Sequence, residues 1–262
     1  MATSVKILYI DMCNFDFWDE YFRELLEAYK NPSTNVEVTH LQTSEEPLSP
    51  FLPPKPYYYA DLFKTIARAE EKGFDAVIIG CAADPGLREA RQMASIPVLA
   101  PLTSALHVAG LLGRRLAVLC PAKEGKRDRP LTWHEDTIRM SGFLPNQVVF
   151  RLVEVEKPQP FVVEELIARG DYAKLREEIL RRYQASIYNF GIKQARLAVE
   201  EEGADVVFFA CTLWGGMLDS VANAVSVPVL DPVITTLKVA ECVAAARVAR
   251  SINCKSAKHR KE

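Results

Sequence analysis

The stretches GFDAVIIGC at residues 73–81 and GADVVFFAC at residues 203–211 decide the fold of this chain of 262 residues. Each starts with glycine, continues through a run of apolar residues and ends in cysteine, and the second lies 130 residues after the first. A second pair, IPVLAP at 96–101 and VPVLDP at 227–232, follows at an offset of 131 residues. A self-similarity of this length indicates two related halves.

Short apolar runs alternate with amphipathic segments, which is typical of βαβ units around a mostly parallel sheet. The expected strands are Val5–Ile10, Val36–Val38, Ala76–Ile79, Val98–Leu99, Leu116–Cys120, Val148–Val153, Val206–Phe209 and Val229–Leu230. The expected helices include Phe17–Tyr29, Tyr57–Lys72, Leu102–Leu112 and Val233–Ser251. The sequence therefore predicts an α/β fold of two pseudosymmetric lobes. Each lobe is a mostly parallel sheet flanked by helices, and the site is expected in the cleft between them.

Composition and charge exclude several classes of protein. With 49% hydrophobic and 25% charged residues the chain has an ordinary globular composition, and its net charge of -2 offers no field for nucleic acid or an anionic membrane. No apolar stretch approaches the roughly 18 residues of a membrane span, so we expect a soluble, cytoplasmic chain without a membrane partner. The spacing of the six cysteines fits neither a disulfide scaffold nor a zinc site, so any chemistry they do is thiol chemistry.

Cys81 and Cys211 each follow an expected parallel strand, at the carboxyl end where ligands bind in α/β proteins. Two acid/base groups on opposite faces of a carbon can invert a stereocentre next to a carbonyl without a cofactor. A helix N-terminus after each thiol is expected to lower its pKa from about 8.5 toward neutrality. The backbone N–H groups in AA at 82–83 and TL at 212–213 are then expected to hold the charge that develops on carbonyl oxygens.

These cysteines have an alternative interpretation as buried apolar residues, which is common for cysteine. Their matched positions in a repeat favour the catalytic interpretation. Cys13 and Cys120 have no such partner in the repeat, and we interpret both as structural. Asp84 precedes Pro85 and is interpreted as a helix cap.

Asp11 and Asn14 follow the first expected strand and are candidates for substrate binding. Asp11 could orient a substrate, tune a thiol or cap the next helix, and the sequence leaves these roles open. The long loops at 42–56 and 121–131 are either surface loops or lids. The chain contains no Walker loop, Rossmann glycine fingerprint, Ser-His-Asp signature or metal-ligand cluster, so we expect no cofactor and no metal.

The motifs GCAADPGLREAR at 80–91 and ACTLWGG at 210–216 resemble the aspartate/glutamate racemase superfamily, and the first resembles its hydantoin racemase branch. This resemblance implies that Cys81 and Cys211 are the catalytic acid/base pair, working without metal or pyridoxal phosphate. It also implies that Ala82, Ala83 and Thr212 line the substrate, while Leu213 is a substrate-binding candidate through its backbone N–H. A final helix that returns to the first lobe is common in the superfamily, so the expected domains are 1–112 plus 233–262, with Cys81, and 113–232, with Cys211.

The leading hypothesis is a cofactor-independent racemase or epimerase acting on a small molecule, such as a 5-substituted hydantoin or related ring. Relatives on the same scaffold keep three alternatives open: a maleate-type cis-trans isomerase, an amino-acid (Asp/Glu) racemase and an arylmalonate-type decarboxylase. A two-lobed binding protein without catalysis is a further alternative. The resemblance also leaves a homo-oligomer open.

Overall fold

The computed structural model describes residues 4–42, 48–51, 55–113, 115–122 and 130–259. Parts of both long loops lie outside these residues, so whether they act as lids stays a prediction. The chain divides into two compact units. The first comprises Met1–Gly80, Pro85–Ala100 and Thr236–Glu262, and the second comprises Cys81–Asp84 and Pro101–Thr235.

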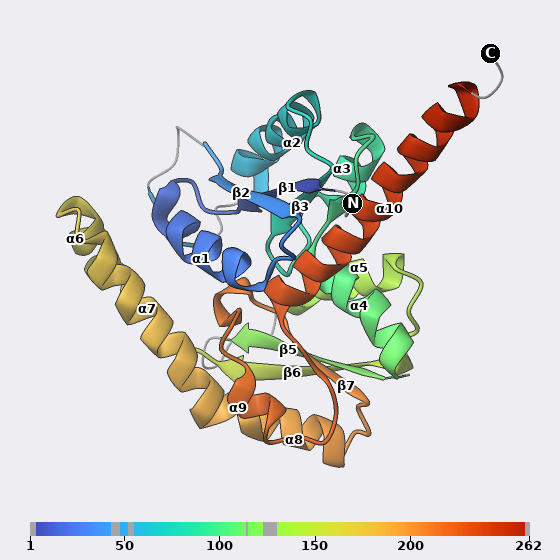
Figure 1. Cartoon of the computed structure of the whole chain (residues 1–262). Coiled ribbons are helices and arrows are strands. Elements are labelled where there is room, and N and C mark those ends of the chain that lie inside the picture. Colours follow the sequence, from blue (N-terminus) through green and yellow to red (C-terminus); the bar gives the residue numbers. More distant parts are fainter. Residues whose placement is uncertain (1–3, 43–47, 52–54, 114, 123–129, 260–262) are drawn as a thin grey trace. The chain divides into compact units, whose positions relative to one another are not determined.

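The first unit is built on a parallel sheet of four strands in the order β2-β1-β3-β4. Its strands are β1 (Val5–Asp11), β2 (Thr34–His40), β3 (Ala76–Gly80) and β4 (Val98–Leu99). Its helices are η1 (Asp16–Trp18), α1 (Asp19–Tyr29), α2 (Lys55–Glu71) and α3 (Leu87–Met93), together with most of α10 (Pro232–His259). Helix α1 packs along β2 (Figure 1). Asp11, the last residue of β1, pairs with His40 on one side and Gly80 on the other.

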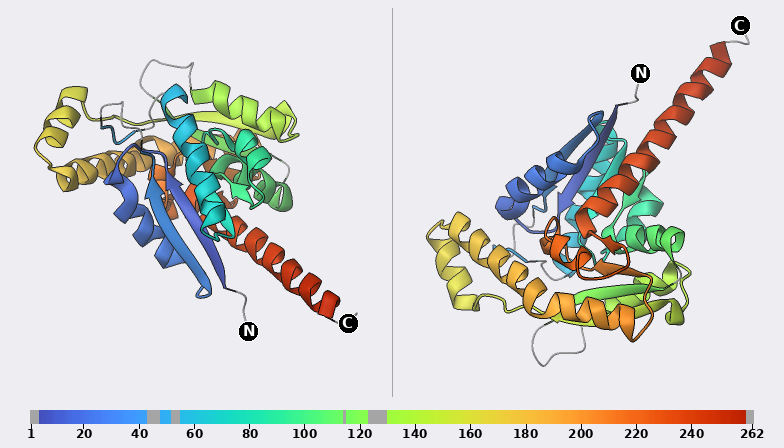
Figure 2. Two further views of the ribbon diagram at one scale, coloured as in Figure 1. Left: turned by 90° about the horizontal axis from the view of Figure 1, so that it is seen from above. Right: turned by 60° about the horizontal axis from the view of Figure 1, so that its bottom comes forward.

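The second unit is built on another four-stranded parallel sheet, in the order β6-β5-β7-β8. Its strands are β5 (Leu116–Ala122), β6 (Val148–Glu154), β7 (Val206–Phe209) and β8 (Val229–Leu230). Its helices are α4 (Pro101–Leu112), α5 (Pro130–Met140), η2 (Pro145–Gln147), α6 (Pro160–Ala168), α7 (Tyr172–Ser186), η3 (Ile187–Gly191), α8 (Ile192–Glu200), η4 (Thr212–Trp214) and α9 (Asp219–Ala222). Figure 2 shows α7, η3 and α8 following one another as one helical run.

Alternate residues of β7 face opposite sides of this sheet, as the period of two in a strand requires. Val206 and Phe208 belong to a buried cluster with Leu102 and Leu106 of α4. Phe209 points the other way and packs on Trp214 with the ring centroids 5.2 Å apart. The core of the second unit therefore has a layer of side chains on each face of the sheet.

Both units have the same strand order, because β5, β6, β7 and β8 take the places of β1, β2, β3 and β4. The equivalence extends to single hydrogen bonds. The N–H of Lys6 donates to Asp75 Oδ2 at 2.8 Å, and the N–H of Arg115 donates to Asp205 Oδ2 at 3.1 Å. The predicted α/β fold of two related halves, each with a parallel sheet flanked by helices, is confirmed.

Strand positions agree with the predicted ones, and strand ends differ. β1 reaches the buried Asp11, and β2 covers Thr34–His40, because ladder pairing continues past the apolar residues. Helix α4 places Leu102, Leu106 and Ala109 in the core cluster of the second unit. The expected domain limits at 112 and 233 remain a prediction.

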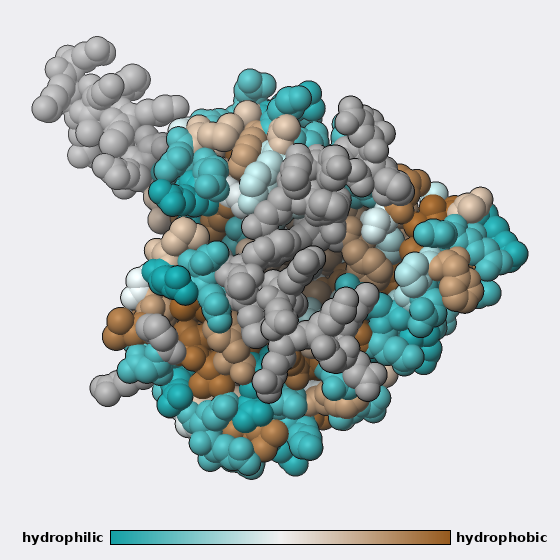
Figure 3. Space-filling view, turned by 180° about the vertical axis from the view of Figure 1, so that it is seen from behind, coloured by the Kyte–Doolittle hydropathy of each residue, from teal (hydrophilic) through white to brown (hydrophobic). Residues whose placement is uncertain are grey.

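The described surface is mixed in character. Figure 3 shows hydrophilic and hydrophobic residues interspersed on the face seen from behind. Large apolar side chains are exposed at the end of α4, where Leu111 is 86% exposed, and at the end of α5, at Met140. Within the described ranges no helix is both long and apolar enough to cross a membrane. The expected homo-oligomer stays a prediction.

Candidate active site

Each sheet has a topological switch point, because its second strand is added on one side of the first strand and its third strand on the other side. β1 lies between β2 and β3, and β5 lies between β6 and β7. The crevice outside the carboxyl ends of the strands at such a switch point is the usual ligand site of an open α/β sheet. Cys81 follows β3 directly, and Cys211 follows β7 after one residue. Both cysteines therefore lie at the switch point of a sheet.

The first thiol turn comprises Cys81–Asp84. The N–H of Asp84 donates to the carbonyl oxygen of Cys81 at 3.0 Å and closes the turn. Cys81 is half-buried, and Ala82 is 2% exposed. Gly80 before the turn has no room for a side chain, because a Cβ there would lie 2.6 Å from Cζ of Tyr9. The strand end that presents Cys81 is therefore closely packed.

The second thiol turn comprises Cys211 and the short helix η4. Sγ of Cys211 lies 3.9 Å from the hydroxyl oxygen of Tyr183, within hydrogen-bonding distance for sulfur. The N–H of Leu213 donates to the same sulfur. Burial raises the pKa of the Cys211 thiol, whereas the Leu213 N–H, the charge of Lys157 and the Tyr183 hydroxyl act against that rise. The thiol form of Cys211 is therefore favoured.

For Cys211, the expectation of a lowered pKa was wrong. The cysteine precedes a three-residue 3₁₀ helix instead of an α-helix, and removal from water outweighs the groups that favour the thiolate. In the first half, the turn does lead into α3, with Gly86 at the N-cap. The Leu213 N–H is directed at the sulfur in this structure, and its role toward a substrate stays a prediction.

A buried hydrogen-bond network holds the second thiol turn to α7. Nε1 of Trp214 donates to Oγ of Ser186 at 3.1 Å and to the carbonyl oxygen of Tyr183 at 3.3 Å. Ser186 donates in turn to that same carbonyl at 2.6 Å. The Tyr183 and Trp214 rings pack with centroids 5.7 Å apart. These contacts fix the tyrosine hydroxyl beside the sulfur of Cys211.

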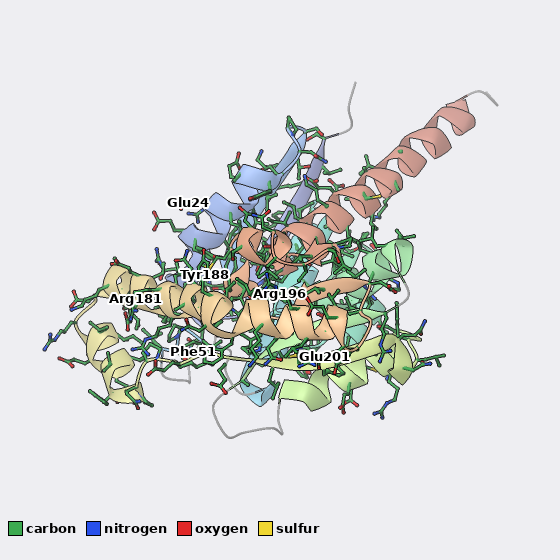
Figure 4. The ribbon with its side chains drawn as sticks, turned by 90° about the horizontal axis from the view of Figure 1, so that it is seen from below. Glu24, Phe51, Arg181, Tyr188, Arg196 and Glu201 are labelled. Atoms are coloured by element: carbon green, nitrogen blue, oxygen red, sulfur yellow. The ribbon has the colours of Figure 1, made fainter. Side chains whose placement is uncertain are left out.

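The network lies where α7 passes into the π-helical segment η3 and then α8. Figure 4 labels Arg181, Tyr188, Arg196 and Glu201 along this helical run. π-Helical segments are rare and occur frequently at functional sites. Here the irregular segment begins one residue after Ser186, which belongs to the network described above.

Asp11, at the end of β1, is a buried carboxyl group with 3% exposure. Its Oδ1 accepts the N–H of Cys13 at 3.3 Å, and within the described part of the chain its Oδ2 has no hydrogen-bond partner. Burial, with a smaller contribution from nearby Asp19, raises the pKa of Asp11 from 3.8 to about 8. His40, whose Nδ1 lies 3.0 Å from Oδ2 of Asp19, acts in the opposite direction. A carboxyl group with this pKa is protonated at neutral pH and can donate a hydrogen bond.

The other candidates are also placed. Asn14 is buried, and its Oδ1 accepts the N–H of Ser49 at 3.1 Å. Thr212 is 8% exposed, and Ala83 is half-buried. Cys120 is fully buried, and burial together with the nearby Cys211 raises the pKa of its thiol.

Tyr183 was missed, because no periodicity in the sequence directs a hydroxyl of α7 toward a cysteine 28 residues further on.

One apolar cluster joins the two thiol turns. Ala82, next to Cys81, and Ala210, next to Cys211, are both members of the buried cluster that contains Leu102 and Phe208. The residues next to the two cysteines therefore pack in the same core cluster. Among the described residues, no group of three His, Cys, Asp or Glu side chains could hold a metal ion.

The fold and the paired turns define a class of protein: an α/β chain of two related units with a cysteine at the switch point of each sheet. A family model described as Asp/Glu/Hydantoin racemase matches residues 22–240. The chain belongs to this family, as the sequence motifs indicated.

Curated relatives include hydantoin racemases from Pseudomonas sp. (strain NS671) and Rhizobium meliloti, each 27% identical to this chain. The match to the Pseudomonas protein covers 70% of this chain and 63% of that relative, and the match to the Rhizobium protein covers 71% and 67%.

Among solved structures, the allantoin racemase from Klebsiella pneumoniae is similar, with a TM-score of 0.66, 20% identity and coverage of 93% of this chain and 89% of that chain. The allantoin racemase from Pseudomonas fluorescens has a TM-score of 0.62, 21% identity and coverage of 94% and 92%. At these identities the structural matches establish the fold alone. Racemases are isomerases, so the predicted enzyme class agrees with the family.

Proposed function

We propose that this protein is a cofactor-independent racemase or epimerase that exchanges the α-proton of a carbonyl carbon acid. Its catalytic residues are Cys81 and Cys211. The observation that carries the proposal is the packing of both thiol turns on one apolar cluster, through Ala82 and Ala210. The named relatives favour a 5-substituted hydantoin as the substrate, because the ring places the reacting carbon next to a carbonyl group.

The reaction needs two proton transfers and no redox step. The thiolate of one cysteine takes the α-proton from one face of the carbon, and the electron pair moves onto the adjacent carbonyl as an enolate. The thiol of the other cysteine then donates its proton to the opposite face, and the enolate collapses to the inverted carbonyl compound. The raised pKa of Cys211 keeps it in the proton-donating form before the first turnover.

The same proposal assigns the substrate contacts. Ala82, Ala83 and Thr212 provide small side chains and backbone N–H groups beside the thiols, where an enolate oxygen needs hydrogen-bond donors. Asp11 ends β1 beside β3, the strand that leads to Cys81, and Asn14 follows β1. Asp11 in its protonated form donates from Oδ2 to a ring carbonyl, which is a task that an ionised carboxylate cannot perform.

Proton NMR in deuterated water tests the proposal directly. The purified protein is incubated with separate enantiomers of allantoin, other 5-substituted hydantoins, aspartate and glutamate, and with maleate and an arylmalonate. We expect loss of the α-proton signal of a hydantoin together with inversion. Cys81→Ser and Cys211→Ser should each abolish inversion, whereas Cys242→Ser, which alters an exposed cysteine on α10, should retain it.

Each other result identifies a different activity. Exchange with an amino acid alone would assign an amino-acid racemase, fumarate formed from maleate would assign a cis-trans isomerase, and loss of carbon dioxide from the arylmalonate would assign a decarboxylase. Inversion that survives in either thiol variant would contradict the two-thiol mechanism. Binding of a ligand that survives alkylation of both thiols, without turnover of any probe, would favour a binding protein.

A further inference from the structure

A buried aspartate ties the first thiol turn to the N-terminus of α4. Oδ1 of Asp84 accepts the N–H of Leu102 at 2.9 Å. Oδ2 accepts the N–H of Thr103 at 2.7 Å and its hydroxyl at 2.6 Å. Asp84 is 6% exposed and lies three residues after Cys81. The predicted helix-cap role is therefore correct in kind, but the capped helix is α4 and not α3, the helix that follows Asp84 directly.

A different aspartate makes the corresponding tie in the second half. Asp231 directly precedes α10, and its Oδ1 accepts the N–H groups of Val233 at 2.8 Å and Ile234 at 2.9 Å. Its Oδ2 accepts the N–H of Gly216 at 2.6 Å. Gly216 lies five residues after Cys211, in the loop that continues the second thiol turn. One carboxylate therefore again connects a thiol loop to a helix N-terminus.

The two carboxylates occupy different positions of the repeat. Asp84 lies in the thiol turn itself, whereas Asp231 lies directly before the capped helix. At the offset of 130 residues, Asp84 matches Trp214, and at the offset of 131, Asp231 matches Ala100. The capped groups are nevertheless equivalent, because the second and third residues of the helix donate in both halves. Both halves therefore have a carboxylate that joins the thiol turn to a helix N-terminus, but the carboxylate comes from a different position in each half.

The backbone conformation of Asp84 indicates that a carboxylate is needed at this position. Its φ is 48°, and among the described residues it is the one non-glycine residue with positive φ. This conformation is unfavourable for a residue with a Cβ atom. A glycine would adopt it more easily, yet the carboxylate occupies the position and makes three buried hydrogen bonds.

We infer that Asp84 and Asp231 are positioning residues, each of which fixes the thiol turn of its own half against a helix N-terminus, Asp84 for Cys81 and Asp231 for Cys211. Any effect of these residues on catalysis rests on the proposed function, whereas the effect of each carboxylate on its thiol can be measured without turnover. Loss of one carboxylate should loosen one turn and leave the other in place.

The first experiment measures the alkylation rate of each cysteine by iodoacetamide, resolved by peptide mass spectrometry, in the full chain. For Asp84→Asn we expect Cys81 to react about tenfold faster, because an amide cannot accept at both oxygen positions and a hydrogen bond to a charged group is lost. Cys211 should keep its rate. For Asp231→Asn we expect the reverse. Asp205→Asn, which removes a carboxylate bonded to the N–H of Arg115, is the matched control and should leave both rates unchanged.

The second experiment transplants the connection. Asp84→Gly combined with Ala100→Asp gives the first half the arrangement of the second, with the carboxylate directly before α4. We expect this double variant to restore the slow alkylation of Cys81 and the turnover lost in Asp84→Gly alone. Should Asp84→Asn fail to fold, Thr103→Val removes a single donor to Asp84 and should accelerate Cys81 in the same direction by a smaller factor.

The outcomes separate the two proposals. Equal acceleration of both thiols in one aspartate variant, or no recovery in the double variant, would overturn the positioning roles even if wild-type protein inverts a hydantoin. Thiol-specific acceleration together with recovery would support them. If that pattern occurs in a protein that turns over no probe, the positioning of the thiols stands and the racemase proposal fails.

Discussion

Asp11 is the residue whose environment departs furthest from that of an ordinary aspartate. Its carboxyl group is buried at the end of β1, and burial with nearby Asp19 raises its pKa from 3.8 to about 8. The N–H of Cys13 and the neighbouring His40 offset only part of this rise. Between pH 4 and pH 8 the folded chain therefore retains a proton that the unfolded chain releases.

This difference predicts how stability responds to pH. Because the folded state binds the extra proton, the contribution of Asp11 to the free energy of unfolding is largest below pH 4 and falls as pH rises toward 8. Asp11→Asn removes that dependence, so its stability relative to wild type should rise from pH 5 to about pH 8 and then level off. Urea denaturation across this range measures the difference, and a constant difference would contradict the assignment.

A control separates Asp11 from its neighbour. The pKa of His40 is raised by its hydrogen bond to Asp19, so its stabilising effect is also lost as pH rises, but only above the ordinary histidine range near 6.5. His40→Gln should therefore lower stability by a constant amount near pH 5, and this loss should shrink as pH rises above about 6. An effect of Asp11→Asn confined to that same upper range would assign the proton to His40.

Tyr183 gives a second prediction at the scale of a single residue. Its hydroxyl lies 3.9 Å from Sγ of Cys211 and counteracts the effect of burial on the thiol pKa. Tyr183→Phe keeps the ring against Trp214 and should move the pH midpoint of Cys211 alkylation upward. The midpoint of Cys81 should stay in place. Tyr188→Phe alters an exposed tyrosine on the same helical run and is the matched control. An unchanged Cys211 midpoint would remove Tyr183 from the site.

At the scale of elements, the π-helical segment η3 is held close to the sheet by its last residue, Gly191. A Cβ at this position would lie 3.2 Å from Cε1 of Phe209, so the ring must shift. We expect Gly191→Ala to destabilise the protein by about 1–3 kcal/mol through overpacking.

Gly110→Ala is the comparison, because its Cβ would meet only Cζ of Phe143, at 3.9 Å, on an exposed position of α4. Helix propensity predicts stabilisation by about 0.5–1 kcal/mol there. Thermal denaturation measures both, and equal effects would argue against close packing of η3.

The elements also show which parts of this fold a sequence can predict. Strands such as β3 and β7 are short, fully buried apolar runs that lead to a repeated cysteine, so their positions and the two thiol turns follow from the pattern. The contacts that tune the thiols do not. Tyr183 reaches Cys211 across 28 residues, and Asp84 caps a helix beyond an intervening strand. Such partners are set by tertiary packing, which leaves no periodic signal.

At the scale of the whole molecule, the chain leaves the first unit after Ala100 and returns to it with α10, from Thr236 onward. Two hydrogen bonds link α10 to Asn31, near the start of the chain, and a third joins the two α10 residues that make them. The N–H of Asn31 donates to Oε1 of Glu241 at 2.6 Å, and Nζ of Lys238 donates to Oε2 of Glu241 and to Oδ1 of Asn31. Glu241 is 4% exposed, so its carboxylate is shielded from water.

Removal of that carboxylate tests whether α10 is an integral part of the first unit. Glu241→Ala removes the buried carboxylate that accepts from Asn31 and Lys238, and hydrogen bonds to a charged group are lost, so we expect a loss of about 1–3 kcal/mol in the free energy of unfolding. Glu37→Ala removes a partly exposed partner of Lys6 and should cost less than about 1 kcal/mol. Denaturant titration followed by hydrogen exchange locates the loss. Protection should fall in α10 and around Asn31 while the second sheet keeps its protection, and an equal fall in both sheets would contradict this assignment.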